Sequence, residues 1–177
     1  MSESSSAGTA LASSFATHLE ARVSERMRRI VDFAIPDRPT WDLCCDHGLI
    51  GLWAWHVHDL PELHFVDRAP RLVGELRTRI AGHIDLTRLF FHQTDASQVE
   101  ISPAPSNLLI GGVGFRAAER IVSNIDPTRG HRVVVSVHAE ADQLPRAMNE
   151  LGWVIAGEAT IEERGRRRSV FAWDGPL

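Results

Sequence analysis

Lysine and tyrosine do not occur in this chain of 177 residues, so all 19 of its basic residues are arginines. Reactions that need a lysine amine are thereby excluded, among them Schiff-base chemistry and phosphate binding by a Walker loop. Long apolar runs are also missing, since no stretch approaches the roughly 18 uninterrupted apolar residues of a transmembrane helix. The missing runs predict a soluble protein with no membrane partner.

Cysteine is scarce, and the only two, Cys44 and Cys45, are neighbours that cannot easily reach ordinary disulfide geometry. This favours a cytoplasmic protein whose thiols stay reduced. Residues 1–14 carry Glu3 where a signal peptide would carry positive charge, and their small and hydroxyl side chains predict a disordered leader. Residues 15–177 are expected to form a single domain, because 44% apolar residues suffice for a core at this length.

An excess of positive charge is absent as well, because the formal net charge is −4. Such a chain has no long-range positive field to capture nucleic acid, so a nucleic-acid partner would need a local patch. The candidates are arginines of the first predicted helix and the run Arg164, Arg166, Arg167 and Arg168. Two interpretations of this run stay open, a solvated hairpin tip and a contact with phosphate groups.

The spacing of apolar residues predicts helices that alternate with strands, beginning with one helix over Phe15–Ala34. The other helices are expected at 49–58, 72–80, up to 124, and at 144–151. Strands are expected at 41–45, 63–66, 86–91, 108–110, 133–137, 153–162 and 167–173. Because parallel strands need long crossovers, this order implies an α/β fold with a mostly parallel, seven-stranded sheet and helices on both faces. A turn at Gly165 joins the last two strands and makes one strand antiparallel.

The carboxyl edge of such a sheet is where ligands bind, and the first strand leads there into Asp46, His47 and Gly48. These residues open a helix whose free amide groups favour an anionic ligand group. The alternative is that Asp46 and His47 only cap that helix.

Two further carboxylates follow the second and third strands. Asp67 lies 25 positions after Asp42, close to the separation at which nucleoside-binding folds place the carboxylate that binds ribose hydroxyls. Asp95, followed by Ala96, could accept a hydrogen bond from an adenine amino group. The alternative for both aspartates is an ordinary turn residue.

The acidic strand ends, the lack of a nicotinamide-type glycine triplet and the terminal antiparallel strand together resemble the S-adenosylmethionine-dependent methyltransferase fold. More narrowly, residues 42–48, Asp-Leu-Cys-Cys-Asp-His-Gly, resemble the Asp-Ile-Gly-Ser-Asp-His-Ala motif of bacterial tRNA adenine-N1 methyltransferases that modify adenine 22. Residues 109–114, Leu-Ile-Gly-Gly-Val-Gly, are similar to that family's Val-Ile-Ala-Gly-Met-Gly. Its Leu-x-x-Arg-Leu start and its Gly-Trp-x-Ile tail are also matched, so the resemblance spans about residues 15–173.

The resemblance implies a Rossmann-like methyltransferase sheet, S-adenosyl-L-methionine as cofactor, S-adenosyl-L-homocysteine as product and tRNA as partner. The segment 44–48 would surround the methionine end, Asp67 the ribose, and Asp95 with Ala96 the adenine, while two glycines would border the methyl group. The implied cofactor-binding residues are Cys44, Cys45, Asp46, His47, Gly48, Asp67, Asp95, Ala96, Gly111 and Gly112. Adenine N1 carries a lone pair, so no catalytic base is assigned.

The chain departs from the family at several positions. Cys44 replaces a glycine, Gly51 a proline, Phe115 a second glycine, and Val137-His138 a Pro-Asn pair. The last two departures are expected where a target base would enter, and the family's C-terminal helical hairpin would follow Leu177. Two alternatives therefore remain: a non-catalytic binding or regulatory module, and a methyltransferase for a small molecule.

Other clusters predict less chemistry. His56 and His58 are two positions apart on a helix and point to different faces, so no metal site is expected. The adjacent cysteines favour buried packing over a redox or zinc site.

Overall fold

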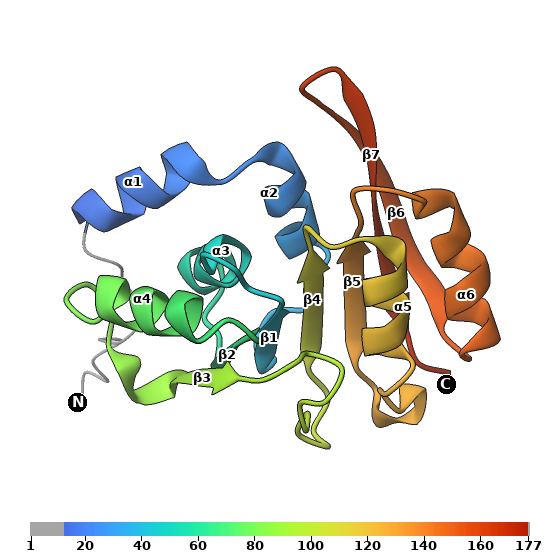
Figure 1. The fold of residues 1–177 in the computed structure, drawn as a ribbon, viewed down its shortest axis with the longest axis horizontal. Coiled ribbons are helices and arrows are strands. Elements are labelled where there is room, and N and C mark those ends of the chain that lie inside the picture. Colours follow the sequence, from blue (N-terminus) through green and yellow to red (C-terminus); the bar gives the residue numbers. More distant parts are fainter. Residues whose placement is uncertain (1–12, 177) are drawn as a thin grey trace, which may run out of the picture.

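Seven strands form one sheet in the computed structural model, which describes residues 13–176 (Figure 1). The strands are β1 (Thr40–Leu43), β2 (Leu63–Asp67), β3 (Leu89–Gln93), β4 (Asn107–Gly111), β5 (Arg132–Ser136), β6 (Val154–Glu163) and β7 (Arg166–Asp174). Their order across the sheet is β3-β2-β1-β4-β5-β7-β6. Strands β1 to β5 pair in parallel, and β7 runs antiparallel between β5 and β6, which confirms the predicted topology.

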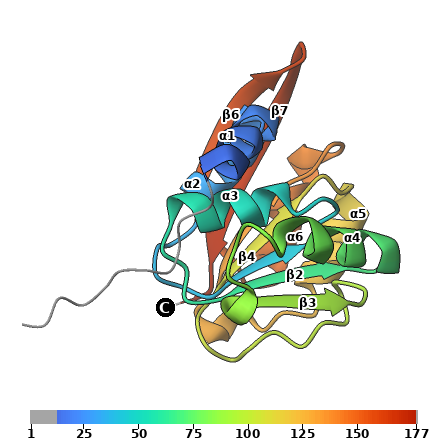
Figure 2. The ribbon, with the colours of Figure 1, turned by 90° about the vertical axis from the view of Figure 1, so that its left-hand side faces the viewer.

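Helices cover both faces of the sheet, also as predicted (Figures 1 and 2). They are α1 (Ser13–Arg22), α2 (Glu25–Asp32), α3 (Leu49–Val57), α4 (Pro70–Ile80), α5 (Phe115–Val122) and α6 (Leu144–Glu150), with short 3-10 turns η1 (Leu86–Arg88), η2 (Pro127–Arg129) and η3 (Ala141–Gln143). The first four helices share a core with Phe65 and Leu109, whereas α5 and α6 pack around Trp41 and Leu108. Within residues 13–176, no helix has the length and apolar character to cross a membrane.

The prediction of one continuous helix over Phe15–Ala34 is wrong, because the chain breaks it at Val23 and Ser24 into α1 and α2. The Ser24 hydroxyl accepts a hydrogen bond from the Met27 amide at 3.4 Å and so caps α2. Helix α1 begins at Ser13, so the last two residues of the predicted leader are helical, and residues 1–12 of that leader lie outside the described residues.

Two strand boundaries differ from the prediction for local reasons. Strand β1 ends at Leu43 rather than at residue 45, because Cys44 turns the chain with a positive φ of 63°. Strand β3 begins at Leu89 rather than at residue 86, because Asp85 accepts a hydrogen bond from the Thr87 amide at 3.0 Å and caps η1.

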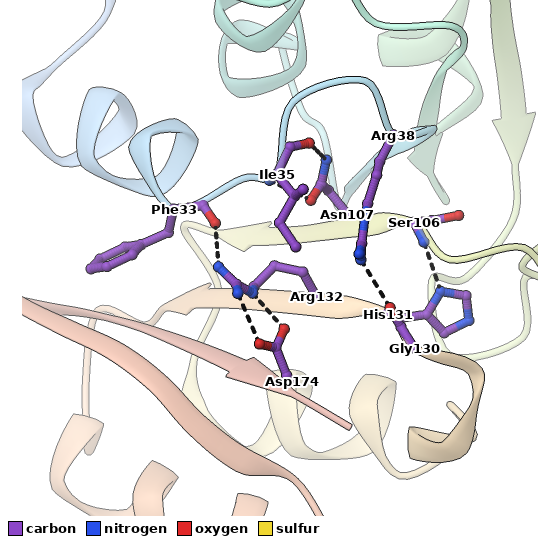
Figure 3. Close-up of polar contacts among 9 residues, drawn as sticks. All are labelled: Phe33, Ile35, Arg38, Ser106, Asn107, Gly130, His131, Arg132 and Asp174. Carbon is purple, nitrogen blue, oxygen red and sulfur yellow. Dashed lines mark hydrogen bonds and ion pairs between the residues drawn. The ribbon is translucent and has the colours of Figure 1, made fainter. Parts of the chain in front are cut away.

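Polar side chains tie the end of α2 to the amino edge of the sheet (Figure 3). Arg132 donates to both carboxylate oxygens of Asp174, at 2.6 and 2.8 Å, and to the Phe33 carbonyl at 2.9 Å. The buried Asn107 amide exchanges two 2.8 Å hydrogen bonds with the backbone of Ile35. These contacts fix the C-terminal end of α2 against β4, β5 and β7.

Candidate functional site

The carboxyl ends of β1, β2 and β4 lie side by side and bring the predicted site segments together. Leu43 at the end of β1 is paired with Val66 of β2 and with Ile110 of β4. The residues at and after these strand ends therefore meet at one edge of the sheet. They are the loop 44–48, Asp67, Gly111 and Gly112. The Cys45 amide donates to the Val66 carbonyl at 2.9 Å and holds the start of the loop there.

The loop 44–48 follows a strained backbone path. Cys44, Asp46 and Gly48 have φ values of 63°, 49° and 68°, a region that only glycine adopts freely. A Cβ atom on Gly48 would lie 2.7 Å from Cδ2 of Leu76, so a larger residue there would also have to displace the Leu76 side chain. Strained conformations of this kind cluster at ligand sites, because the surrounding structure imposes them.

Two residues from neighbouring elements hold this loop in place. The Asp67 carboxylate accepts hydrogen bonds from the Asp46 amide at 3.0 Å and from the Ala69 amide at 2.9 Å. Arg79 on α4 donates to the His47 carbonyl. Asp67 therefore joins the end of β2 to the loop and stays partly exposed at its side.

Asp95 lies beside the end of β2, because the Thr94 amide donates to the Asp67 carbonyl at 3.2 Å. One oxygen of Asp95 accepts from the Ser97 amide at 2.9 Å and the Ser97 hydroxyl at 2.7 Å, and the other pairs with Arg120 at 3.1 Å. The bond from the Ser97 amide is the main reason that the pKa of Asp95 lies below its ordinary value. Asp95 thus has the local partners of a turn residue at the position predicted for adenine recognition.

A cavity of about 190 Å³ opens at this edge. Six of the ten predicted cofactor residues line it, namely Cys44, Cys45, Asp46, His47, Gly111 and Gly112. The other four do not line it: Gly48 shapes the loop, and Asp67 and Asp95 lie outside the wall. The buried Ala96 borders a separate cavity of about 480 Å³ between the 96–103 loop and α5.

The cavity wall also contains residues that the sequence did not predict, chiefly Arg26 and Met27 of α2. They reach the site because Ser24 ends α1 and starts α2 in a new direction. A serine at the break was the one signal that could have indicated this, since serine favours helix N-termini.

A buried carboxyl group, Asp42, lies beneath the loop and was not among the predicted site residues. Burial raises the pKa of Asp42 to about 7, and the charges of Asp67 and Asp46 add to this, against a stabilising 2.8 Å hydrogen bond from the Gly51 amide. The family that the sequence resembles has proline at the position of Gly51, and proline has no N–H to donate.

The two thiols are not activated. Burial is the main cause that raises the pKa of Cys44 to about 11, with help from Asp67, and burial also raises the pKa of Cys45. Both thiols are therefore protonated at neutral pH, which favours packing over nucleophilic or redox chemistry. Within residues 13–176, no group of three or more histidine, cysteine or acidic residues could hold a metal ion.

Two departures from the motif have different positions. The Phe115 ring is buried in the core and borders a cavity between α5 and α6 rather than the cavity lined by the loop 44–48. His138 is exposed at the carboxyl edge, with its ring 3.7 Å from where a Cβ of Gly114 would lie. Arg168 donates to the His138 carbonyl at 2.6 Å.

Comparison with known proteins points to one enzyme class. Residues 23–171 match the family described as methyltransferase domain, whereas no curated protein matches the chain in sequence. B. subtilis TrmK, an M1A22 tRNA methyltransferase, has a TM-score of 0.76 at 13% identity, over 88% of this chain and 67% of that chain. M. capricolum TrmK in complex with S-adenosyl-homocysteine has a TM-score of 0.74 at 11% identity, over 86% of this chain and 68% of that chain.

Sp1610 of Streptococcus pneumoniae, solved with S-adenosyl-L-methionine, has a TM-score of 0.73 at 14% identity, over 88% of this chain and 74% of that chain. At these identities the structural likeness shows a shared fold. The sequence match goes further, because it extends from the start of α2 into β7 and includes the cavity, and the chain therefore belongs to the methyltransferase domain family.

Proposed function

We propose that this protein is an S-adenosylmethionine-dependent methyltransferase that acts on RNA, with adenine N1 of tRNA as the target. The observation that carries the proposal is the strained loop 44–48, which lines a cavity at the carboxyl edge of a methyltransferase-family sheet. The solved relatives with bound S-adenosylmethionine or S-adenosylhomocysteine support the choice of cofactor.

The residues present suit this cofactor. Gly112 has a φ of 76°, and a Cβ atom there would meet no atom of the described residues within 4 Å, so it borders open space. The carboxylates of Asp46 and Asp67 favour a ligand with a cationic amino group and sulfonium. At about 190 Å³ the cavity is smaller than the roughly 300–1,000 Å³ of complete ligand pockets, so it suits the methionine end, with the adenosine over Asp67 and Asp95.

When bound, this cofactor supplies a methyl group on a positively charged sulfur. The loop 44–48 would orient the methionine end, while the apolar side chains of Met27 and Ile50 in the cavity wall would keep water from it. The lone pair of adenine N1 would form the new bond to the methyl carbon as the sulfur–carbon bond breaks, and no proton would have to be removed for that transfer. Positioning therefore suffices, and no residue is assigned as a general base.

An RNA partner is supported by arginines at the tip of the β6–β7 hairpin and in the first helices, since the chain as a whole carries a net charge of −4 and can attract phosphate only through such a local patch. A cytoplasmic location follows from the proposal, because tRNA is found there and the unpaired Cys44 and Cys45 remain reduced.

Calorimetry with S-adenosylmethionine tests the cofactor assignment. We expect binding by the wild type, and a loss of about 1.5–3 kcal/mol in Asp67→Ala through hydrogen bonds from ribose to a charged group. Asp95→Ala is expected to weaken binding, whereas Asp126→Ala is not. Asp126 is a matched control, because it also accepts from the amide and hydroxyl of the residue two positions on and pairs with an arginine. No binding by the wild type, or equal effects of Asp95→Ala and Asp126→Ala, contradicts the assignment.

A further inference from the structure

Arginines from two distant parts of the sequence line one groove of about 540 Å³. They are Arg22 and Arg26 from the junction of α1 and α2, and Arg164, Arg166 and Arg168 from the hairpin of β6 and β7. Helix α2 packs against both hairpin strands, whose tip projects beyond the rest of the fold (Figures 1 and 2). The N-terminus of α2, capped by Ser24, also lines the groove and adds the positive end of its dipole.

The groove adjoins the methyltransferase cavity, because Arg26 and Met27 border both. Arg26 therefore lies between the place where the methyl group would be held and a surface rich in guanidinium groups. Guanidinium groups bind phosphate with two parallel hydrogen bonds, which makes arginine suited to nucleic-acid backbones.

The hairpin divides its arginines between two faces. Side chains alternate along a strand, so Arg166 and Arg168 share the groove face and Arg167 lies on the opposite one. The partner strand follows the same rule, since Glu163 is opposite Arg166 and Glu162 is opposite Arg167. The run of arginines seen in the sequence is therefore not one patch.

Glu163 is the one acidic residue among those that line the groove. Its carboxylate lies 3.4 Å from Nε of Arg26, and this buried nitrogen forms no hydrogen bond with any residue of the range 13–176. The Arg26 side chain is 16% exposed and that of Glu163 is 23% exposed, so this pair lies in the wall of the groove. A carboxylate at this distance neutralises Arg26 without satisfying its donor.

We propose that the groove binds the phosphate backbone of the RNA strand that delivers the target base, and that phosphate displaces Glu163 from Arg26. The inference rests on the proposed function, because the groove shares a wall, Arg26 and Met27, with the cavity assigned to the methyl donor. The proposal adds a binding surface for the RNA backbone and assigns to the Glu163 carboxylate the role of competing with phosphate for Arg26.

Binding of bulk tRNA at a series of salt concentrations tests this binding surface, with Arg166→Ala and Arg167→Ala as a matched pair. The two residues are adjacent, exposed and equal in charge. We expect Arg166→Ala to weaken binding several-fold and to lower the slope of log K against log salt by about 1, as for the loss of one phosphate contact. Arg167→Ala is expected to change neither quantity. Equal effects of the two substitutions, or no tRNA binding by the wild type at low salt, overturn the proposal.

The role of Glu163 is tested with Glu163→Gln and Glu162→Gln, which remove the same charge from opposite faces of β6. Glu163→Gln is expected to tighten tRNA binding several-fold more than Glu162→Gln, because only Glu163 competes for Arg26. Equal tightening would show a general charge effect and contradict the displacement.

Calorimetry with S-adenosylmethionine on the same four variants separates the two proposals. All four are expected to bind the cofactor like the wild type. If the wild type and the four variants bind tRNA with the expected affinities but the wild type methylates no RNA, the proposed function is contradicted and the groove proposal is not. If Arg166→Ala methylates and binds tRNA as well as the wild type, the groove fails and the proposed function stands.

Discussion

Cys44 has a backbone conformation that is typical of glycine. Its φ of 63° is the conformation that a glycine at this position would adopt freely, and its neighbours in the loop, Asp46 and Gly48, alternate with it in the same region. A cysteine held in this conformation carries the strain in the folded protein itself.

Cys44→Gly is expected to be more stable than Cys44→Ala by about 0.5–1 kcal/mol, because glycine removes the left-handed strain and alanine retains it. Both variants lose the thiol, so the comparison isolates the backbone effect. Chemical denaturation measures the free energy of unfolding. Equal stability of the two variants, or a less stable glycine variant, would mean that the loop is not strained at this position.

Asp42 gives the stability a distinctive pH dependence. Its pKa is about 7 in the folded protein and 3.8 ordinarily, so between these values the native state binds more protons than the unfolded chain. Its contribution to stability is therefore full below pH 4 and falls as pH rises through 7. Relative to Asp42→Asn, the free energy of unfolding of the wild type is expected to fall by up to about 1.4 kcal/mol per pH unit in this window. A difference between the two proteins that is constant from pH 4 to 8 would contradict the burial of this carboxyl group.

The sequence predicted the edge of the sheet at which the two carboxylates lie, but it did not predict their hydrogen-bond partners. Asp67 and Asp95 were placed at the correct edge because acidic residues end two apolar runs. Their bonds to the Asp46 amide and to Ser97 depend on the path of two loops, which apolar spacing does not encode.

Helix α2 is the element on which both the cavity and the groove depend. It supplies Arg26 and Met27 at one end and is anchored at the other through Ile35, whose backbone pairs with the buried Asn107. A glycine at 157 also lets the Phe33 ring pack closely on β6.

Asn107→Ala is expected to lower the free energy of unfolding by about 2–4 kcal/mol, because it leaves both backbone groups of Ile35 without their partner. Asn107 also donates to the Thr40 hydroxyl at 3.1 Å, which adds to the loss. The matched control is Asn124→Ala, an exposed asparagine whose amide donates to the Arg120 carbonyl, and a change within about 0.5 kcal/mol is expected there. Similar losses in the two variants would show that the anchor is unimportant.

The elements predicted best were those with continuous apolar runs, such as β4 and β5, because burial on both faces leaves a continuous signal. The break at Ser24 was missed, because the apolar spacing continues across it from Leu19 to Ile30. The sequence also did not predict that the hairpin arginines lie on two faces. Alternating side chains can be assigned to one face or the other only when the positions of the partner strand and of α2 are known.

At the scale of the whole molecule, positive side chains gather in one place although the net charge is negative. Carboxylates gather where the cationic methyl donor would lie, and arginines line the adjoining groove, although the chain as a whole carries −4. The net charge alone therefore excluded only long-range attraction of RNA and left open a local contact of this kind.

Methylation of bulk tRNA with labelled S-adenosylmethionine, followed by nucleoside analysis, tests the central claim most directly. The account predicts label in 1-methyladenosine, and less of it with Asp67→Ala, while Asp126→Ala matches the wild type. Label that enters a metabolite extract but not tRNA would indicate a small-molecule methyltransferase, and cofactor binding without any transfer would indicate a binding module. Either result would contradict the assignment of RNA methylation.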